Sequence, residues 1–452
     1  MSSDSQLKKM TETPIPKLII MLSIPTVISM LITNIYNVVD TAFVGKLGYS
    51  AGGAVGIVFG FMSILQAIGF MFGQGCGSIL SRRLGARDVE GASISASTGF
   101  FSAFTLALIV EIICILNLDR LVFMLGSTET IAPYAKTYIF YILLAAPFTV
   151  SSFTLNNILR YEGKAALGMI GMMSGAILNI FGDAVLMFVF NLGITGAGIS
   201  TAVSQIVSFI ILLSMFLSGH TESKLSLKNV SISFNVLGDI MGTGFPSFLR
   251  QALNSITTIL LNMEAGVYGD RAVDAMSIVS RIIFFTFSLS LGIGQGFQPV
   301  SGFNYGAKKY DRLKKAYKFT CFLSEALLLV FGVVLELIPN QLIELFTNDT
   351  EVIRIGIRAL RLQAAAQLFL PFCMTTEMLF QSTGKKLYAT IMSALRNGIL
   401  FIPSLLILAK LRGLNGIQEA QPLAFILAVP PSIYMAIYYF KKEMPKENNN
   451  TK

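Results

Sequence analysis

The sequence is poor in the side chains that most enzymes place at their catalytic centres. It has a single histidine, His220, and four cysteines among its 452 residues. One histidine excludes most zinc sites and argues against a Ser-His-Asp centre. All four cysteines lie in apolar stretches, so neither a disulfide framework nor a CxxC metal site is expected. No Gly-Lys pair is followed by serine or threonine, which excludes the phosphate-binding loop of ATPases.

Charged residues are scarce as well. They make up 13% of the chain, against about 25% in an average soluble domain, and the mean hydropathy is +0.68. The net charge of +9 does not indicate nucleic-acid binding, because the basic residues fall in short loops between apolar runs. The composition therefore predicts a protein whose main partner is the lipid bilayer, with no enzymatic activity, no bound cofactor and no nucleic acid.

Long apolar runs dominate what is present. A helix needs about 20 mostly apolar residues to cross a bilayer, and twelve runs meet this condition. They lie near 18–45, 53–80, 93–116, 133–157, 167–190, 196–217, 237–266, 274–302, 319–339, 356–382, 388–409 and 420–440. Because the runs are continuous and not alternating, they favour helices over a closed β-barrel. We expect an all-α polytopic membrane protein with twelve transmembrane helices.

Basic residues mark one side of this protein. They gather near the N-terminus, after the second span at Arg82, Arg83 and Arg87, in the Lys308–Lys318 cluster, and in the C-terminal tail. Lys and Arg in short loops mark the cytoplasmic side. We therefore expect a multi-pass protein of the cell membrane with both termini in the cytoplasm. Residues Met1–Met10 are polar and lack the apolar core of a signal peptide, so the first apolar segment is expected to stay.

The chain matches itself at an offset of 221 residues without a gap. Pro25 corresponds to Pro246, and the Gly-Gln-Gly run at 73–75 corresponds to that at 294–296. Each half crosses the membrane six times, so the two bundles share one orientation and form a parallel repeat. We expect a first bundle at 1–217, a cytoplasmic linker at 218–235 and a second bundle at 236–452, in a monomer.

Two acids stand out within the spans of the first half. Asp40 has Tyr36 one turn before it, and Asp183 has Asn179 one turn before it, so each pair shares a helical face. At the repeat offset the acids correspond to Leu261 and Ser404, so the shared fold does not require them. Because a charge at mid-membrane is costly, the acids are candidates for coupling; a structural hydrogen-bond network is the alternative.

Further polar residues complete the prediction. Tyr138, Thr201 and Gln205 add hydroxyl, phenol and amide groups, which together with the acids suit a proton relay or Na⁺ at Asp40, Asn179, Asp183 and Thr201. Pro25 is expected to break the first helix four turns before Asp40 and to act as a hinge. Gln205 and Glu377 are candidates for a substrate cavity. Gly69, Gly73 and Gly77 have the spacing of a close helix–helix contact.

The chain resembles the multidrug and toxic compound extrusion (MATE) family, in its MepA/DinF-like branch. The resemblance covers nearly the whole chain and depends on four segments: Ile24–Gly45, Ser81–Ala86, Leu178–Asp183 and Gly193–Gly198. It implies export of organic cations and drugs in exchange for H⁺ or Na⁺. It also implies a first-bundle cation site at Tyr36, Asp40, Tyr138, Asn179, Asp183 and Thr201. The second-bundle acid of the NorM-like branch is absent, since Gln251–Ser255 holds none.

Three functions remain open at this point. The first is an ion-coupled multidrug antiporter for apolar cations, with Met and Phe lining the cavity between the bundles and H⁺ favoured over Na⁺. The second is a lipid-linked oligosaccharide flippase of the same superfamily. The third is a membrane scaffold or receptor, which would not need buried carboxylates in one half only.

Overall fold

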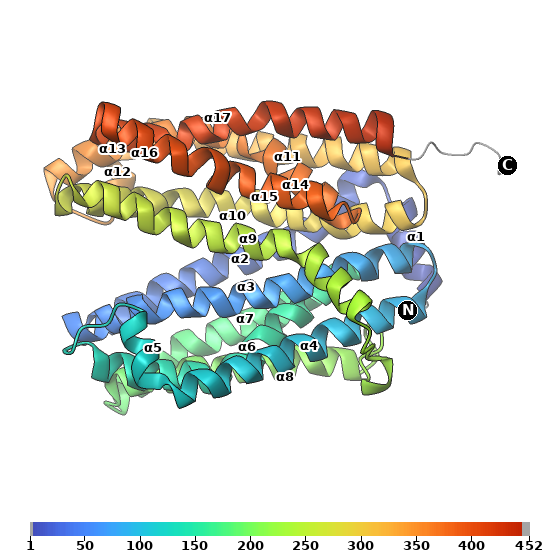
Figure 1. Ribbon diagram of the computed structural model, residues 1–452, viewed down its shortest axis with the longest axis horizontal. Coiled ribbons are helices and arrows are strands. Elements are labelled where there is room, and N and C mark those ends of the chain that lie inside the picture. The colour runs from blue at the N-terminus through green and yellow to red at the C-terminus, as the bar shows by residue number, and fades with distance from the viewer. Residues whose placement is uncertain (1–2, 445–452) are drawn as a thin grey trace. The chain divides into compact units, whose positions relative to one another are not determined.

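The computed structural model describes residues 3–444, and all regular secondary structure in that range is helical (Figure 1). Ten segments of it are helical, long and apolar enough to cross a membrane, and they agree with ten of the predicted spans. The seventh span is α9 (Phe234–Gly266), and the tenth is divided between α13 (Thr350–Gln367) and α14 (Leu370–Ser382). The prediction of an all-α protein with twelve spans in two bundles is confirmed.

The first half has eight α-helices among the described residues, and all but the short α1 and α5 belong to predicted spans. The eight are α1 (Ser3–Glu12), α2 (Ile15–Gly45), α3 (Tyr49–Gly85), α4 (Val89–Leu116), α5 (Leu118–Met124), α6 (Ala132–Tyr161), α7 (Ala165–Asp183) and α8 (Gly193–Leu217). The π-helix η1 (Ala184–Val189) continues α7, and the short 3₁₀-helix η2 (Leu227–Asn229) lies in the linker.

The second half has corresponding helices after α9. They are α10 (Asp270–Gly306), α11 (Tyr310–Leu337), α12 (Pro339–Glu344), α13, α14, α15 (Lys386–Ala394), α16 (Phe401–Arg412) and α17 (Leu414–Tyr438). The π-helix η3 (Leu395–Leu400) joins α15 to α16, and η4 (Tyr439–Glu443) ends the described chain.

The helices form two compact units that do not follow chain order. Within the described range, the first unit contains the residues up to Lys9 and Ile28–Phe248, and the second contains Met10–Val27 and the residues from Leu249 on. The expected boundaries, which placed 10–27 in the first bundle and 236–248 in the second, therefore differ from those of the structure. Both α2 and α9 pass from one unit to the other, at positions that correspond under the repeat.

Glycines explain this exchange of segments. In the first unit a Cβ on Gly75 would lie 2.1 Å from the Ile240 carbonyl oxygen, and one on Gly244 would lie 1.7 Å from that of Met71. In the second unit a Cβ on Gly296 would lie 2.8 Å from the Ser23 backbone. Without side chains, these backbones approach closely, so the first part of α9 packs on α3 and the first part of α2 packs on α10.

The predicted contact of the glycines at the end of the second span is confirmed. A Cβ on Gly69, Gly73 or Gly77 would lie 2.7, 2.8 or 2.3 Å from side-chain atoms of α6. The residues met are Phe153, Asn157 and Tyr161, which have the same spacing of four. The two helices therefore pack along one face with no room for a methyl group.

Two expectations about helix breaks need correction. α2 continues through Pro25 and α9 continues through Pro246, so neither proline ends its helix. A proline leaves the backbone dihedrals helical, and its neighbours in a packed bundle hold the helix together around it. The tenth span, predicted as one helix, is interrupted after Gln367, and α14 restarts with Pro371 in its first turn, where proline is favoured.

Candidate functional site

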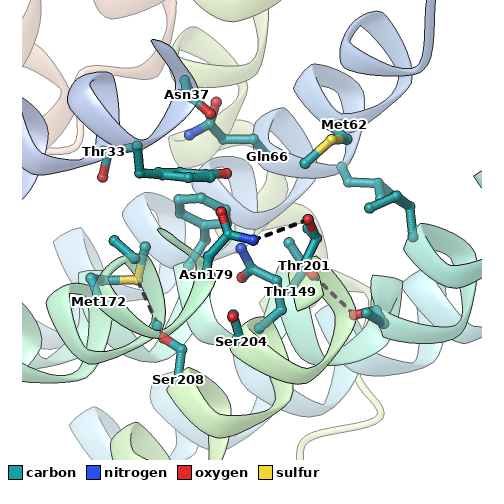
Figure 2. A pocket seen from close by; sticks show the side chains of 18 of the residues that line it. Thr33, Asn37, Met62, Gln66, Thr149, Met172, Asn179, Thr201, Ser204 and Ser208 are labelled. Atoms are coloured by element: carbon teal, nitrogen blue, oxygen red, sulfur yellow. Dashed lines mark hydrogen bonds between the residues drawn. The ribbon is translucent and has the colours of Figure 1, made fainter. Parts of the chain in front are cut away.

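A cavity of about 70 Å³ lies within the first unit, between α2, α3, α6, α7 and α8 (Figure 2). Its polar lining includes Tyr36, Asn37, Asn179, Thr201 and Gln205. Apolar side chains complete the wall, and they are mostly large and adaptable: Phe59, Met62, Leu65, Ile142, Phe153 and Met172. The cavity therefore offers a mixed surface on which an apolar molecule with one polar group can lie.

Asn179 is the centre of the polar contacts at this cavity. Its Nδ2 lies 3.3 Å from Asp183 Oδ1 and 3.2 Å from Thr201 Oγ1, and Figure 2 shows the amide pointing toward Thr201. The hydroxyl of Ser200 donates to the Asn179 carbonyl oxygen at 3.1 Å. The spacing of four between Asn179 and Asp183 is thus used as the sequence predicts.

The two acids are brought together from α2 and α7. The carboxyl groups of Asp40 and Asp183 lie near enough to interact electrostatically, and Tyr36 lies within electrostatic range of both. The Tyr138 hydroxyl donates to Asp40 Oδ2 at 3.4 Å. Asp183 and Tyr138 are fully buried, and Asp40 is 8% exposed. These four residues and Asn179 and Thr201 therefore form one cluster, which we call the acid cluster.

The acid cluster has acceptors without donors. Asp40 Oδ1, Asp183 Oδ2 and Asn179 Oδ1 are buried and have no hydrogen-bond partner among the described residues. These three oxygens are acceptors that can bind a proton, and they are also the kind of ligand that coordinates a hard cation such as Na⁺. The described chain has no group of three or more His, Cys, Asp or Glu side chains that would favour a transition metal.

The helix that carries Asp183 changes its winding at this residue. Asp183 is the last residue of α7, and the π-helical turn η1 follows directly. Single π-helical turns inside helices often occur at functional sites, because the wider turn shifts the side chains that follow. The apolar run at 167–190 contains no proline that would predict such a turn.

Sequence reasoning missed several residues of the cavity. Ser200, Ser204 and Gln66 have polar side chains on the faces that meet the cavity or Asn179. Ser200 and Ser204 lie four residues apart in α8 beside Thr201, and this spacing was the available signal. Gln66 had none, since a single amide in an apolar helix does not indicate which way it points.

The predicted cavity residue Glu377 has a different setting. It lies in α14 of the second unit, is 4% exposed and forms an ion pair with Arg250 of α9. It is not among the side chains that line the cavity of its own unit. Gln205, the other residue predicted for a substrate cavity, lines the cavity of the first unit.

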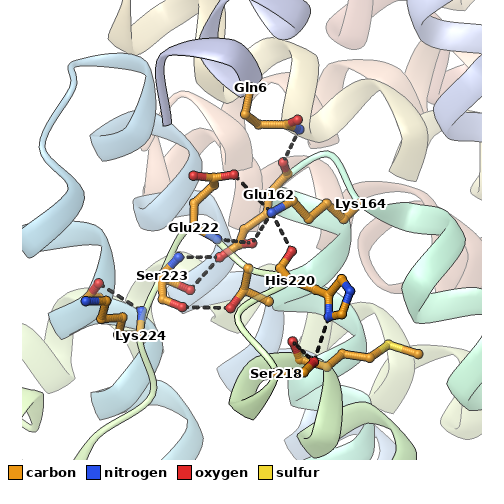
Figure 3. A network of polar contacts seen from close by, with 11 residues as sticks. Gln6, Glu162, Lys164, Ser218, His220, Glu222, Ser223 and Lys224 are labelled. Atoms are coloured by element: carbon orange, nitrogen blue, oxygen red, sulfur yellow. Dashed lines mark hydrogen bonds and ion pairs between the residues drawn. The ribbon is translucent and has the colours of Figure 1, made fainter. Parts of the chain in front are cut away.

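A second polar network holds the linker against the first unit (Figure 3). The Glu162 carboxylate accepts from the amides of Glu222 and Ser223 at 3.0 and 2.9 Å, and Lys164 donates to the His220 carbonyl oxygen at 2.6 Å. Gln6 of α1 donates to the Glu162 carbonyl oxygen at 2.7 Å. Burial raises the pKa of Glu162, although Ser223 and Lys164 oppose the shift.

Comparisons with known proteins agree with the repeat and with the fold. The family model described as MatE matches residues 25–185 and 246–407. The multidrug export protein MepA of Staphylococcus saprophyticus is 29% identical over 415 residues, and that of Staphylococcus aureus is 28% identical; 92% of each chain is covered in both cases.

A solved structure is similar to this chain over almost the full length of both proteins. It is described as an outward-facing conformation of a multidrug resistance MATE family transporter of the MOP superfamily. The TM-score is 0.91 at 27% identity, and the match covers 98% of this chain and 99% of the other.

Proposed function

Because this chain belongs to the MatE family, we propose that it is a secondary active multidrug efflux antiporter of the cell membrane, with both termini in the cytoplasm. It exports organic cations and drugs in exchange for H⁺, with Na⁺ as the alternative coupling ion. One observation carries the proposal: two buried acids belong to a cluster in which three oxygens have no donor among the described residues, directly beside a cavity.

The electrostatics of the acid cluster support ion coupling. A carboxylate in the middle of a membrane costs about 2.5–3.5 kcal/mol on insertion scales, and two adjacent carboxylates also repel each other. Among the described residues no basic side chain forms an ion pair with Asp40 or Asp183. A proton shared by the pair, or a bound cation, removes both costs. The loaded and the empty cluster therefore differ in free energy, which gives the ion a means to drive a conformational change.

Three residues link the cluster to the cavity. Tyr36, Asn179 and Thr201 line the cavity and also belong to the acid cluster. A positively charged drug in the cavity stabilises the ionised acids, whereas a proton on the acids weakens the attraction for that drug. Drug and proton therefore oppose each other, as antiport requires. The Phe and Met side chains of the wall favour drugs with large apolar parts.

Na⁺ remains the alternative ion because the donors of the cluster suit it. Asp40, Asp183, Asn179 and Thr201 supply only oxygen ligands. The flippase alternative has less support: a lipid-linked oligosaccharide carries an anionic phosphate, and the acids of the first unit would repel it.

The test is drug uptake into proteoliposomes under an imposed gradient. We expect accumulation of a cationic dye when a pH gradient is imposed without Na⁺, and its loss when the gradient is collapsed. Accumulation that depends on a Na⁺ gradient at constant pH would replace H⁺ by Na⁺ and leave the site unchanged. Transport that needs neither gradient would contradict antiport.

A further inference from the structure

The second unit has a cavity of its own, of about 100 Å³. It lies between α9, α10, α13, η3 and α17, which are the repeat equivalents of the helices around the first cavity. Most of its lining positions correspond to lining positions of the first cavity at the offset of 221 residues. Examples are Asn254 for Thr33, Thr257 for Tyr36 and Gln363 for Ile142. The repeat therefore builds the same cavity twice, and the side chains give each copy its own chemistry.

The charge in the two cavities has opposite sign. The first is bordered by the acid cluster, and Leu261 takes the position of Asp40 in the second. The position of Gly175 in the first cavity is taken by Arg396 in the second. A guanidinium thus enters the second cavity where the first has no side chain at all.

Arg396 is held in place but is not satisfied. It is 6% exposed, and its Nε donates to Asn397 Oδ1 at 3.0 Å. Its guanidinium carbon lies 5.4 Å from the ring centre of Phe287 and 5.3 Å from that of Phe425, so two aromatic rings fix its direction. Nη1 has no hydrogen-bond partner among the described residues. Buried donors are normally hydrogen-bonded, so this unpaired N–H indicates that an acceptor from outside the chain can bind here.

The charged residues around Arg396 do not balance and include one more positive than negative charge. Glu377 interacts electrostatically with both Arg250 and Arg396, and its ion pair is with Arg250. Two arginines against one glutamate leave a net charge of plus one in this part of the unit. Gln363, at 3% exposure, also lines the cavity, and within the described range 3–444 neither its Oε1 nor its Nε2 has a hydrogen-bond partner.

We propose that the second cavity is a binding site for a monovalent anion, specifically the carboxylate of a small aromatic acid. Arg396 Nη1 and Gln363 Nε2 are free to donate to carboxylate oxygens, and an Arg–carboxylate contact is strong because it is charge-assisted. The rings of Phe284, Phe401 and Phe425 give an apolar wall for the rest of the molecule. This site is distinct from the cation site proposed for the first unit.

A halide would use the same donors but would gain nothing from the aromatic wall. The two anions are therefore separated by comparing sodium benzoate, sodium acetate and sodium chloride at equal sodium concentration, with sodium sulfate as the balancing salt. The readout is the unfolding temperature of the purified full-length protein. A thiol-reactive dye reports unfolding through the buried Cys76, Cys321 and Cys373.

We expect benzoate to raise the unfolding temperature in a saturable way, and more strongly than acetate or chloride. Arg396→Gln should weaken the apparent affinity about tenfold or more, because it removes a charge-assisted contact. Arg396→Lys should retain part of the effect. Gln363→Leu, which keeps the charge, should weaken benzoate less than Arg396→Gln does. The matched control is Arg354→Gln, which removes an exposed positive charge from the same unit.

The outcomes separate the parts of the proposal. Equal benzoate stabilisation of the wild type and of Arg396→Gln would overturn it, and so would the absence of any anion effect on the wild type. If Arg396→Gln does not fold, the decision passes to Arg396→Lys and Gln363→Leu, which must both weaken benzoate. An effect that depends on Arg396 but is equal for chloride and benzoate would keep the anion site and overturn the aromatic acid as its ligand.

Discussion

At the scale of single residues, the structure combines contacts that the sequence predicts with contacts that it does not. The interaction of Asn179 with Asp183 follows from their spacing of four. The contact between Tyr138 and Asp40 joins residues 98 positions apart, so no spacing along the chain predicts it, and only the family resemblance placed the two residues in one site. Arg396 was visible as a charge within a span, but its free N–H depends on where its neighbours lie.

Asp183→Asn is expected to abolish drug export while the protein still folds. Asparagine has nearly the same size and retains a hydrogen bond to Asn179, but it can neither release a proton nor contribute a charge to a cation site. Drug accumulation in cells without their own pumps gives the measurement, with membrane expression checked in parallel. The matched control is Asp88→Asn. Asp88 caps the N-terminus of α4, and asparagine caps a helix about as well as aspartate does. Normal resistance conferred by Asp183→Asn would remove Asp183 from the coupling mechanism.

Glu162→Gln should change how stability depends on pH. Burial raises the pKa of Glu162 above its ordinary value of 4.5, so the folded protein binds a proton more tightly than the unfolded one. Its contribution is fully present below about pH 4.5 and is lost as the pH rises through the raised pKa. As the pH rises from about 4.5, the unfolding temperature of the wild type should therefore fall relative to that of Glu162→Gln.

Far-ultraviolet circular dichroism during heating, at a series of pH values, measures this difference. Asp88→Asn serves as the control with the opposite sign. The pKa of Asp88 is lowered by the Gly91 amide and by Arg83, so its contribution is lost as the pH falls below 3.8. Parallel curves for the wild type and Glu162→Gln would show that the carboxyl has the same pKa in the folded and unfolded states.

At the scale of helices, the apolar runs predict where the spans lie but not how they are wound. Each predicted range agrees, to within one residue at its ends, with one observed helix or with consecutive helical segments, because length and hydropathy determine what can cross a bilayer. The π-helical turns η1 and η3 and the break between α13 and α14 depend on packing against neighbours, which a single span does not record. The continuity of α2 through Pro25 has the same origin.

Gly77→Ala should destabilise the contact between α3 and α6. The new methyl carbon would lie 2.3 Å from the Tyr161 ring, and overpacking of this kind costs about 1–3 kcal/mol. Gly60→Ala in the same helix is the control, because nothing lies within 4 Å of the position. It should leave stability unchanged or raise it, since alanine favours helix over glycine. Unfolding temperatures of the two variants test this, and equal values would contradict the contact.

Pro25→Ala tests the predicted hinge. Alanine supplies the missing amide N–H and should make α2 stiffer, so we expect stability equal to or above that of the wild type together with reduced drug export. Pro246→Ala provides the comparison at the equivalent position of α9. Unchanged export by a stable Pro25→Ala protein would exclude a hinge role for this proline.

At the scale of the whole molecule, the repeat predicts two similar bundles. Chain order alone does not predict which segments belong to each, because each unit contains a segment from the other half of the chain. The offset of 221 residues relates the spans of the two halves, and it also relates the two positions where the chain passes between units, after Val27 and after Phe248. The exchange itself could not be predicted from hydropathy. It depends on glycines such as Gly75 and Gly244 that meet only in three dimensions.

The exchange predicts how separate halves should behave. When residues 1–230 and 231–452 are produced as two chains in one cell, a tag on either should purify both, because each unit needs a segment from the other chain. Gly75→Leu should reduce the yield of the pair, since its side chain would meet the Ile240 carbonyl oxygen. Gly60→Leu is the matched control. If each half purified alone as a folded protein, the exchanged segments would be dispensable.

The reciprocal exchange also constrains how such a chain can have arisen. A single half, with six spans, would leave its own first segment without a place in its own bundle. Two copies of that half would each accept the segment of the other, as in a swapped dimer. Linking the copies end to end would preserve every contact of that dimer and would free each copy to change separately. The acids of one half and Arg396 of the other are the kind of divergence that such a fusion permits, because a symmetric dimer must carry every substitution twice.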